Sequence, residues 1–95
     1  MELKALLVTS DAEMRGLFAD LFRGIGISTE VCRDANGAVE EVSRKKFEAV
    51  VLDFDCIADE ILLIESLRQS RANRNAVLLT VASDDSANTQ HESRP

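Results

Sequence analysis

Four short strand-like segments, separated by stretches whose apolar residues recur every three or four positions, constrain the fold of this chain most. Residues 4–9, 49–53 and 76–82 are nearly continuous apolar runs, and residues 27–32 alternate apolar and polar side chains. Short apolar runs are typical of strands buried in a parallel sheet, and alternation is typical of an edge strand. Helical crossovers between such strands predict a three-layer α/β fold, β-α-β-α-β-α-β, with helices on both faces.

The first crossover helix is expected over residues 12–23. Ser10 and Glu13 match an S-x-x-E capping box at its start. Asp11 would then lie in the first helical turn, where the helix dipole favours an acid. The side chains predicted to form its core-facing stripe are Met14, Leu17, Phe18, Leu21, Phe22 and Ile25.

Two further helices complete the predicted crossovers. Asp34 is the expected N-cap of the second helix. The core-facing residues of this second helix would be Ala35, Ala38, Val39 and Val42. The third helix is predicted over residues 59–71, with Ile61, Leu63, Ile64 and Leu67 facing the core.

Composition bounds the domain organisation and the class of partner. The 95 residues suffice for one domain, which we expect at residues 1–83, followed by a flexible polar tail at residues 84–95. A net charge of −6 argues against a nucleic-acid partner. Neither a membrane-spanning run nor a secretory signal is recognisable, so we expect a cytoplasmic protein with no membrane partner. Cys32 and Cys56 fit no metal or redox spacing and are expected to be reduced thiols.

Polar residues follow the ends of the predicted strands, where ligands bind in parallel sheets. The segments KALLVTSDAEMRGLF at 4–18 and EAVVLD at 48–53, with the Leu-Arg pair at 67–68, carry a family resemblance. The chain resembles the receiver domains of bacterial two-component signalling. That resemblance implies a flavodoxin-like sheet with strand order 2-1-3-4, and it places Asp53 at the phospho-acceptor position.

The resemblance also implies a magnesium site beside the acceptor, with departures from the family. Receivers hold Mg²⁺ with an acidic pair after the first strand, the acceptor, and a carbonyl two residues beyond it. Asp53 and Asp55 match the last two positions, and Asp11 is a third candidate ligand. The acidic pair is replaced by Thr9 and Ser10, which are neutral. Because Mg²⁺ favours carboxylate ligands, we expect it to bind weakly.

The family's later elements have no counterpart here. The switch hydroxyl aligns with Val81, and the sequence ends before the fifth strand and its lysine. The strand at 76–82 is therefore expected to be a bare apolar edge beside an uncovered sheet face. Such a surface favours a homodimer or a partner protein that completes the sheet.

Three functional hypotheses follow, none of them an enzyme. The first is a degenerate pseudo-receiver that acts through protein contacts and self-association. The second is a single-domain response regulator phosphorylated on Asp53, for which the resemblance implies a histidine kinase partner. The third is a truncated remnant of a longer regulator.

Overall fold

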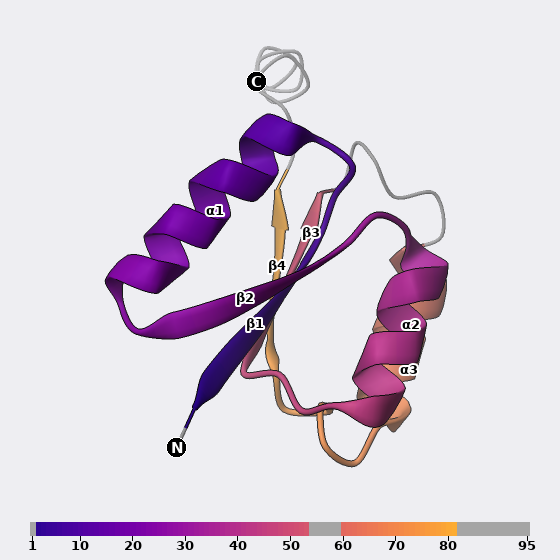
Figure 1. The fold of residues 1–95 in the computed structure, drawn as a ribbon. Helices are drawn as coiled ribbons and strands as arrows, with labels where there is room; N and C mark the ends of the chain where they lie inside the picture. Colours follow the sequence, from indigo (N-terminus) through magenta and orange to yellow (C-terminus); the bar gives the residue numbers. More distant parts are fainter. Residues whose placement is uncertain (1, 54–59, 82–95) are drawn as a thin grey trace, which may run out of the picture.

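The computed structural model describes residues 2–53 and 60–81 (Figure 1). The elements in chain order are β1 (Leu3–Val8), α1 (Ala12–Gly24), β2 (Ile27–Cys32), α2 (Ala35–Arg44), β3 (Ala49–Asp53), α3 (Glu60–Gln69) and β4 (Val77–Val81). All strand pairs are parallel, and the sheet order is β2-β1-β3-β4. The predicted α/β class and strand order are confirmed. The predicted tail at residues 84–95 lies outside the described residues.

The sheet separates two helical layers of unequal size. Helices α2 and α3 lie together on one face, and α1 lies on the other (Figure 1). The buried core lies between the sheet and the α2–α3 layer. Its members are Leu6, Val8, Ala35, Ala38, Val42, Phe47, Val50, Leu52, Leu63 and Leu67. Side chains alternate between faces along a strand, so the odd-numbered residues of β1, β3 and β4 point to the α1 side.

Both predicted N-caps can be compared with the structure. Asp34 caps α2 as expected, since its Oδ1 accepts a hydrogen bond from the Gly37 amide at 2.8 Å. The Ser10 capping box is wrong. The N-cap of α1 is Asp11, whose Oδ1 accepts from the Glu13 amide at 2.9 Å. Asp11 has extended backbone angles, so the helix begins one residue later than a Ser10 cap requires.

The predicted core-facing stripe of α1 is only half right. Met14, Phe18 and Phe22 are partly buried, whereas Leu17, Leu21 and Ile25 are 58%, 55% and 69% exposed. Helix α1 contacts mainly β2, and no other described helix lies on its face of the sheet. The exposed side of the stripe, formed by Leu17, Leu21 and Ile25, therefore has no packing surface within the described residues.

Helix α3 differs from its prediction at one residue. Leu63 and Leu67 are fully buried and Ile64 is partly buried, as expected. Ile61 is 69% exposed, so its predicted inward position is wrong. Two residues correspond to about 200° of helix rotation, which places Ile61 on the side opposite Leu63.

A buried asparagine joins the two turns at the amino ends of β3 and β4. Asn73 is fully buried, and its Oδ1 accepts a hydrogen bond from the Phe47 amide at 2.6 Å. Its Nδ2 donates to the carbonyls of Val42 and Lys45, both at 2.8 Å. These carbonyls belong to the last turn of α2 and the residue after it, where helix carbonyls lack helical partners. Asn73 thus caps α2 from a distant turn and fixes where β3 begins.

Within the described ranges, none of the helices is long and apolar enough to cross a membrane.

Candidate functional site

The candidate site lies at the carboxyl ends of the two central strands. Asp53 ends β3, and Thr9 follows β1 in the adjacent position, because Val8 pairs with Leu52. The Thr9 hydroxyl donates a hydrogen bond to Asp53 Oδ2 at 2.7 Å. Both residues are buried, with 0% and 2% exposure. The prediction that Asp53 ends a buried central strand is therefore confirmed, and a neutral hydroxyl lies against its carboxylate.

The Thr9 hydroxyl is held from both sides. Its oxygen accepts a hydrogen bond from the Asp11 backbone amide at 3.0 Å while its proton is donated to Asp53. A hydroxyl has a single proton, so this pair of contacts fixes its orientation. The arrangement joins the end of β1, the start of α1 and the end of β3 through one side chain.

The three predicted metal ligands are only partly brought together. Asp53 lies in the site, but the Asp11 carboxylate is exposed and accepts from the amide of Glu13 at the start of α1. Asp55 lies outside the described residues. Across residues 2–53 and 60–81, no three acidic, histidine or cysteine side chains form a cluster that could hold a metal. The described donors are one buried carboxylate and a hydroxyl that donates to it, and this set does not fit Mg²⁺.

Cys32, at the end of β2, is a free and partly buried thiol. Burial raises its pKa to about 11, and the negative charges of Glu41, Asp34 and Glu30 act in the same direction. The thiolate is the reactive form of cysteine, so this thiol is poorly reactive at neutral pH. Cys56, also predicted to be a reduced thiol, lies outside the described residues.

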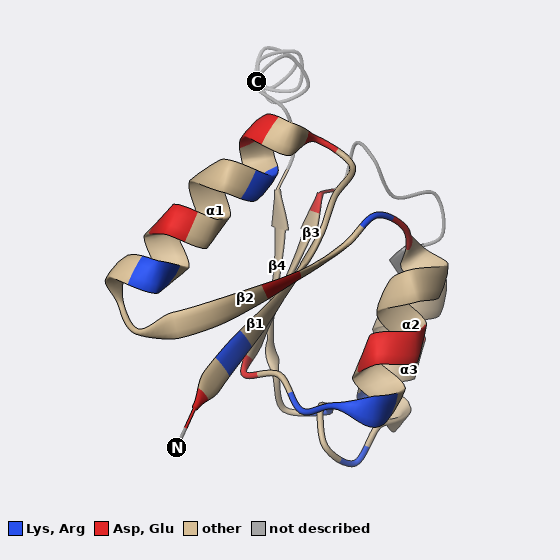
Figure 2. Cartoon of the chain, viewed as in Figure 1, with Lys and Arg blue, Asp and Glu red and all other residues tan. Residues whose placement is uncertain are grey.

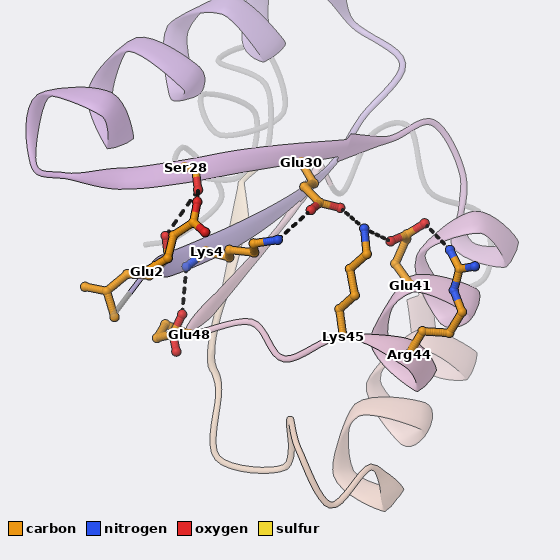
Figure 3. Close-up of polar contacts among 9 residues, drawn as sticks. Glu2, Lys4, Ser28, Glu30, Glu41, Arg44, Lys45 and Glu48 are labelled. Atoms are coloured by element: carbon orange, nitrogen blue, oxygen red, sulfur yellow. Dashed lines mark hydrogen bonds and ion pairs between the residues drawn. The ribbon is translucent and has the colours of Figure 1, made fainter.

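A chain of ion pairs links β1, β2 and the end of α2 (Figure 3). Glu30 accepts from Lys4 Nζ at 3.2 Å and from Lys45 Nζ at 2.8 Å. Lys45 also lies 3.2 Å from Glu41, which pairs with Arg44 at 3.0 Å. The hydrogen bond from Lys45 lowers the pKa of Glu30 against the opposing effect of burial, and Lys4 lowers it further. The carboxylates of Glu30 and Glu41 raise the pKa of Lys45 through their hydrogen bonds to it.

A shallow depression of about 380 Å³ adjoins this ion-pair chain, and it is lined by Glu2, Lys4, Lys45, Lys46 and Glu48. Its lysines suggest an anion site at first sight. Lys4 and Lys45 share Glu30, however, and Lys46 lies 3.9 Å from Glu48. The amines are already neutralised by neighbouring carboxylates. The depression therefore lacks the unpaired positive charge that would hold an anion.

Sequence reasoning noted Thr9 only as the neutral replacement for an acid and missed its bond to Asp53. The register of β1 and β3 is the signal that could have revealed it, because adjacent parallel strands place their terminal side chains together. Asn73 was missed entirely. It lies in a polar turn segment, RANRN at 71–75, where composition alone predicts exposed side chains.

Solved structures that are similar to this chain support the fold. No family model and no curated protein matches the sequence. A sensor protein from Polaromonas sp. JS666 is similar in structure, with a TM-score of 0.73 and 20% identity, over 100% of this chain and 78% of that one. The receiver domain of a sensor histidine kinase from Pseudomonas aeruginosa PAO1, with magnesium coordinated in its active-site cleft, is similar over 96% and 75% of the two chains. Its TM-score is 0.76, and 15% of the residues are identical.

Proposed function

The chain has the receiver-domain fold, and we propose that it is a pseudo-receiver, a signalling module of two-component type that works through protein contacts and self-association. In this proposal it is not an enzyme and does not depend on phosphoryl transfer. The observation that carries the proposal is the 2.7 Å hydrogen bond from Thr9 to Asp53. Thr9 occupies the position where the resemblance to receivers calls for a metal-binding acid.

The chemistry of phosphoryl transfer explains why this bond matters. A carboxylate attacks phosphorus effectively when a dication neutralises the phosphoryl oxygens. The position of Thr9 supplies no negative charge to hold such an ion, and its proton engages one oxygen of the nucleophile. Asp53 is also 2% exposed, so an incoming phosphoryl group has little access to it in this conformation.

The test is exposure of the 95-residue chain to acetyl phosphate, and separately to beryllofluoride, in the presence of Mg²⁺. Intact mass and NMR would detect any change at Asp53, and Asp53→Asn serves as the background control. We expect no adduct. An adduct on the unmodified chain that disappears in Asp53→Asn would refute the pseudo-receiver and support the alternative, a single-domain response regulator with a histidine kinase partner.

That alternative draws support from the placement of Asp53. The carboxylate ends a buried central strand at the edge of the sheet where parallel α/β folds bind ligands. The double variant Thr9→Asp, Ser10→Asp restores the acids that the resemblance calls for. If this variant gains an adduct while the unmodified chain does not, the two neutral residues are the cause of inactivity.

A further inference from the structure

The first turn of α2 contains an asparagine followed directly by a glycine. Asn36 is exposed, and it lies two residues after the N-cap Asp34. A Cβ at position 37 would lie 3.3 Å from Asp34 Oδ1, so glycine leaves room for the close approach of the cap. The same lack of a side chain leaves the Gly37 nitrogen unshielded beside the Asn36 amide. The dipeptide therefore combines a nucleophile with an amide carbon that it can attack.

The reaction that these two groups can undergo is cyclisation of the asparagine side chain. The Gly37 nitrogen bonds to Cγ of Asn36 and gives up its proton, which closes a succinimide ring. The C–N bond of the side-chain amide breaks, and its nitrogen leaves with that proton as ammonia. Water then opens the ring at one of its two carbonyls. The product is an aspartate or an isoaspartate, and water is the single co-reactant.

The fold holds the Gly37 nitrogen back from this attack. Its N–H donates to Asp34 Oδ1 at 2.8 Å, and the Ala38 amide donates to the Asp34 carbonyl at 3.2 Å. These bonds keep Asn36 within the helix, where ψ is about −42°. Ring closure requires a different ψ, one that brings the Gly37 nitrogen to the same side as the Asn36 side chain. Cyclisation therefore requires the first turn of α2 to open.

The two ends of α2 are held by different residues, so the first turn can open by itself. Asn73 binds the last turn through the carbonyls of Val42 and Lys45, whereas Asp34 caps the first. Figure 2 shows an acidic position directly before α2 and none in its first turn, so the cap carboxylate is the acid that faces this end of the helix dipole. Helix ends open locally at a lower free energy than the whole domain.

We propose that Asn36 is a site of spontaneous deamidation and that the Asp34 cap sets its rate in the folded protein. This inference does not depend on the proposed function. The two products should affect α2 differently. Aspartate keeps the chain length and adds an acid where the helix dipole favours one. Isoaspartate lengthens the main chain before Gly37, so the Gly37 amide can no longer return to Asp34 and the first turn stays open.

Peptide mapping by mass spectrometry, after incubation of the 95-residue chain at mildly alkaline pH, measures the loss of the Asn36 amide. Asn36 should be lost faster in urea, where the cap is absent, than in the folded chain. Asp34→Ala should speed the loss roughly fivefold in the folded chain, since an N-cap side chain contributes about 1 kcal/mol, and should not speed it in urea. Asp34→Ser, which can still cap the helix, should restore the original rate. Circular dichroism would verify that each variant is folded.

Two controls test the local nature of the opening. Asn73→Ala weakens the domain but leaves the Asp34 cap in place, so it should not speed the loss at temperatures where the variant is folded. Asn75 is an exposed asparagine followed by Ala76, whose side chain shields the attacking nitrogen, so it should keep its amide longer. Equal losses of Asn36 and Asn75 in urea would overturn the site. An unchanged folded-state rate in Asp34→Ala would overturn the role of the cap, and so would equal acceleration by Asn73→Ala.

Discussion

Replacing Asn73 with alanine would disconnect the two turns at the amino ends of β3 and β4. The amide side chain accepts from Phe47 N at 2.6 Å and donates to the carbonyls of Val42 and Lys45 at 2.8 Å. All three partners are backbone groups, so none of them can turn away to find another partner. Asn73 itself is fully buried, so water does not reach the amide in the folded state.

The cost of Asn73→Ala follows from these contacts. Each net hydrogen bond contributes about 1 kcal/mol, so three lost bonds remove about 3 kcal/mol. The Phe47 amide, left buried without its partner, raises the cost, and a water entering the space of the lost amide lowers it. We expect a loss of about 2–4 kcal/mol. Domains of this size are stable by about 5–15 kcal/mol, so the loss is a large share of the total.

Urea denaturation followed by circular dichroism measures this change. With a denaturant slope of about 1–2 kcal/mol/M, the midpoint should fall by about 1–4 M. The matched control is Asn75→Ala, an exposed asparagine two residues further along the same turn, which should change stability by less than about 0.5 kcal/mol. If the two variants unfold at the same urea concentration, the asparagine does not hold the turns together and the reasoning is refuted.

Three further predictions follow from other contacts. Thr9→Asp places a second buried acid beside Asp53, so it should lower the melting temperature without Mg²⁺, and Mg²⁺ should restore it only in the variant. The hydrogen bond from Lys45 lowers the pKa of Glu30, so Glu30→Gln should destabilise the protein at neutral pH. The two stabilities should converge as the pH falls below 4.5, which urea titrations at several pH values would measure. Cys32, with a pKa of about 11, should react with iodoacetamide roughly 100-fold more slowly in the folded chain than in urea.

The strands were predictable because their signals are local: residues 49–53, for example, are apolar up to Asp53. The helical stretches between the strands predicted a parallel sheet, and the resemblance to receivers implied the order β2-β1-β3-β4 that the structure shows. Helix periodicity was less informative. It identified the apolar stripe of α1 but not how wide a surface the sheet offers to it. Leu17 and Leu21 belong to the stripe and are exposed because packing partners come from outside the helix.

In the candidate site, too, local features were predictable and contacts between distant segments were not. The position of Asp53 follows from a single segment and was predicted, whereas its bond to Thr9 depends on the pairing of strands 44 residues apart. Asn73 and Asn75 lie in one polar turn and are alike in composition, yet one is buried and the other exposed. Only the packing of that turn against the end of α2 distinguishes the two asparagines, and the local sequence pattern does not predict this packing.

The Thr9–Asp53 bond predicts that the self-association proposed for this chain does not depend on the state of Asp53. A ligand shifts an equilibrium only as far as its affinities for the two states differ. If the site holds neither Mg²⁺ nor a phosphoryl group, neither can favour the dimer or the monomer. Sedimentation with and without Mg²⁺ and beryllofluoride should give the same association constant. A change of tenfold or more, equal to about 1.4 kcal/mol, would show that Asp53 is linked to self-association and that the site still acts as a switch.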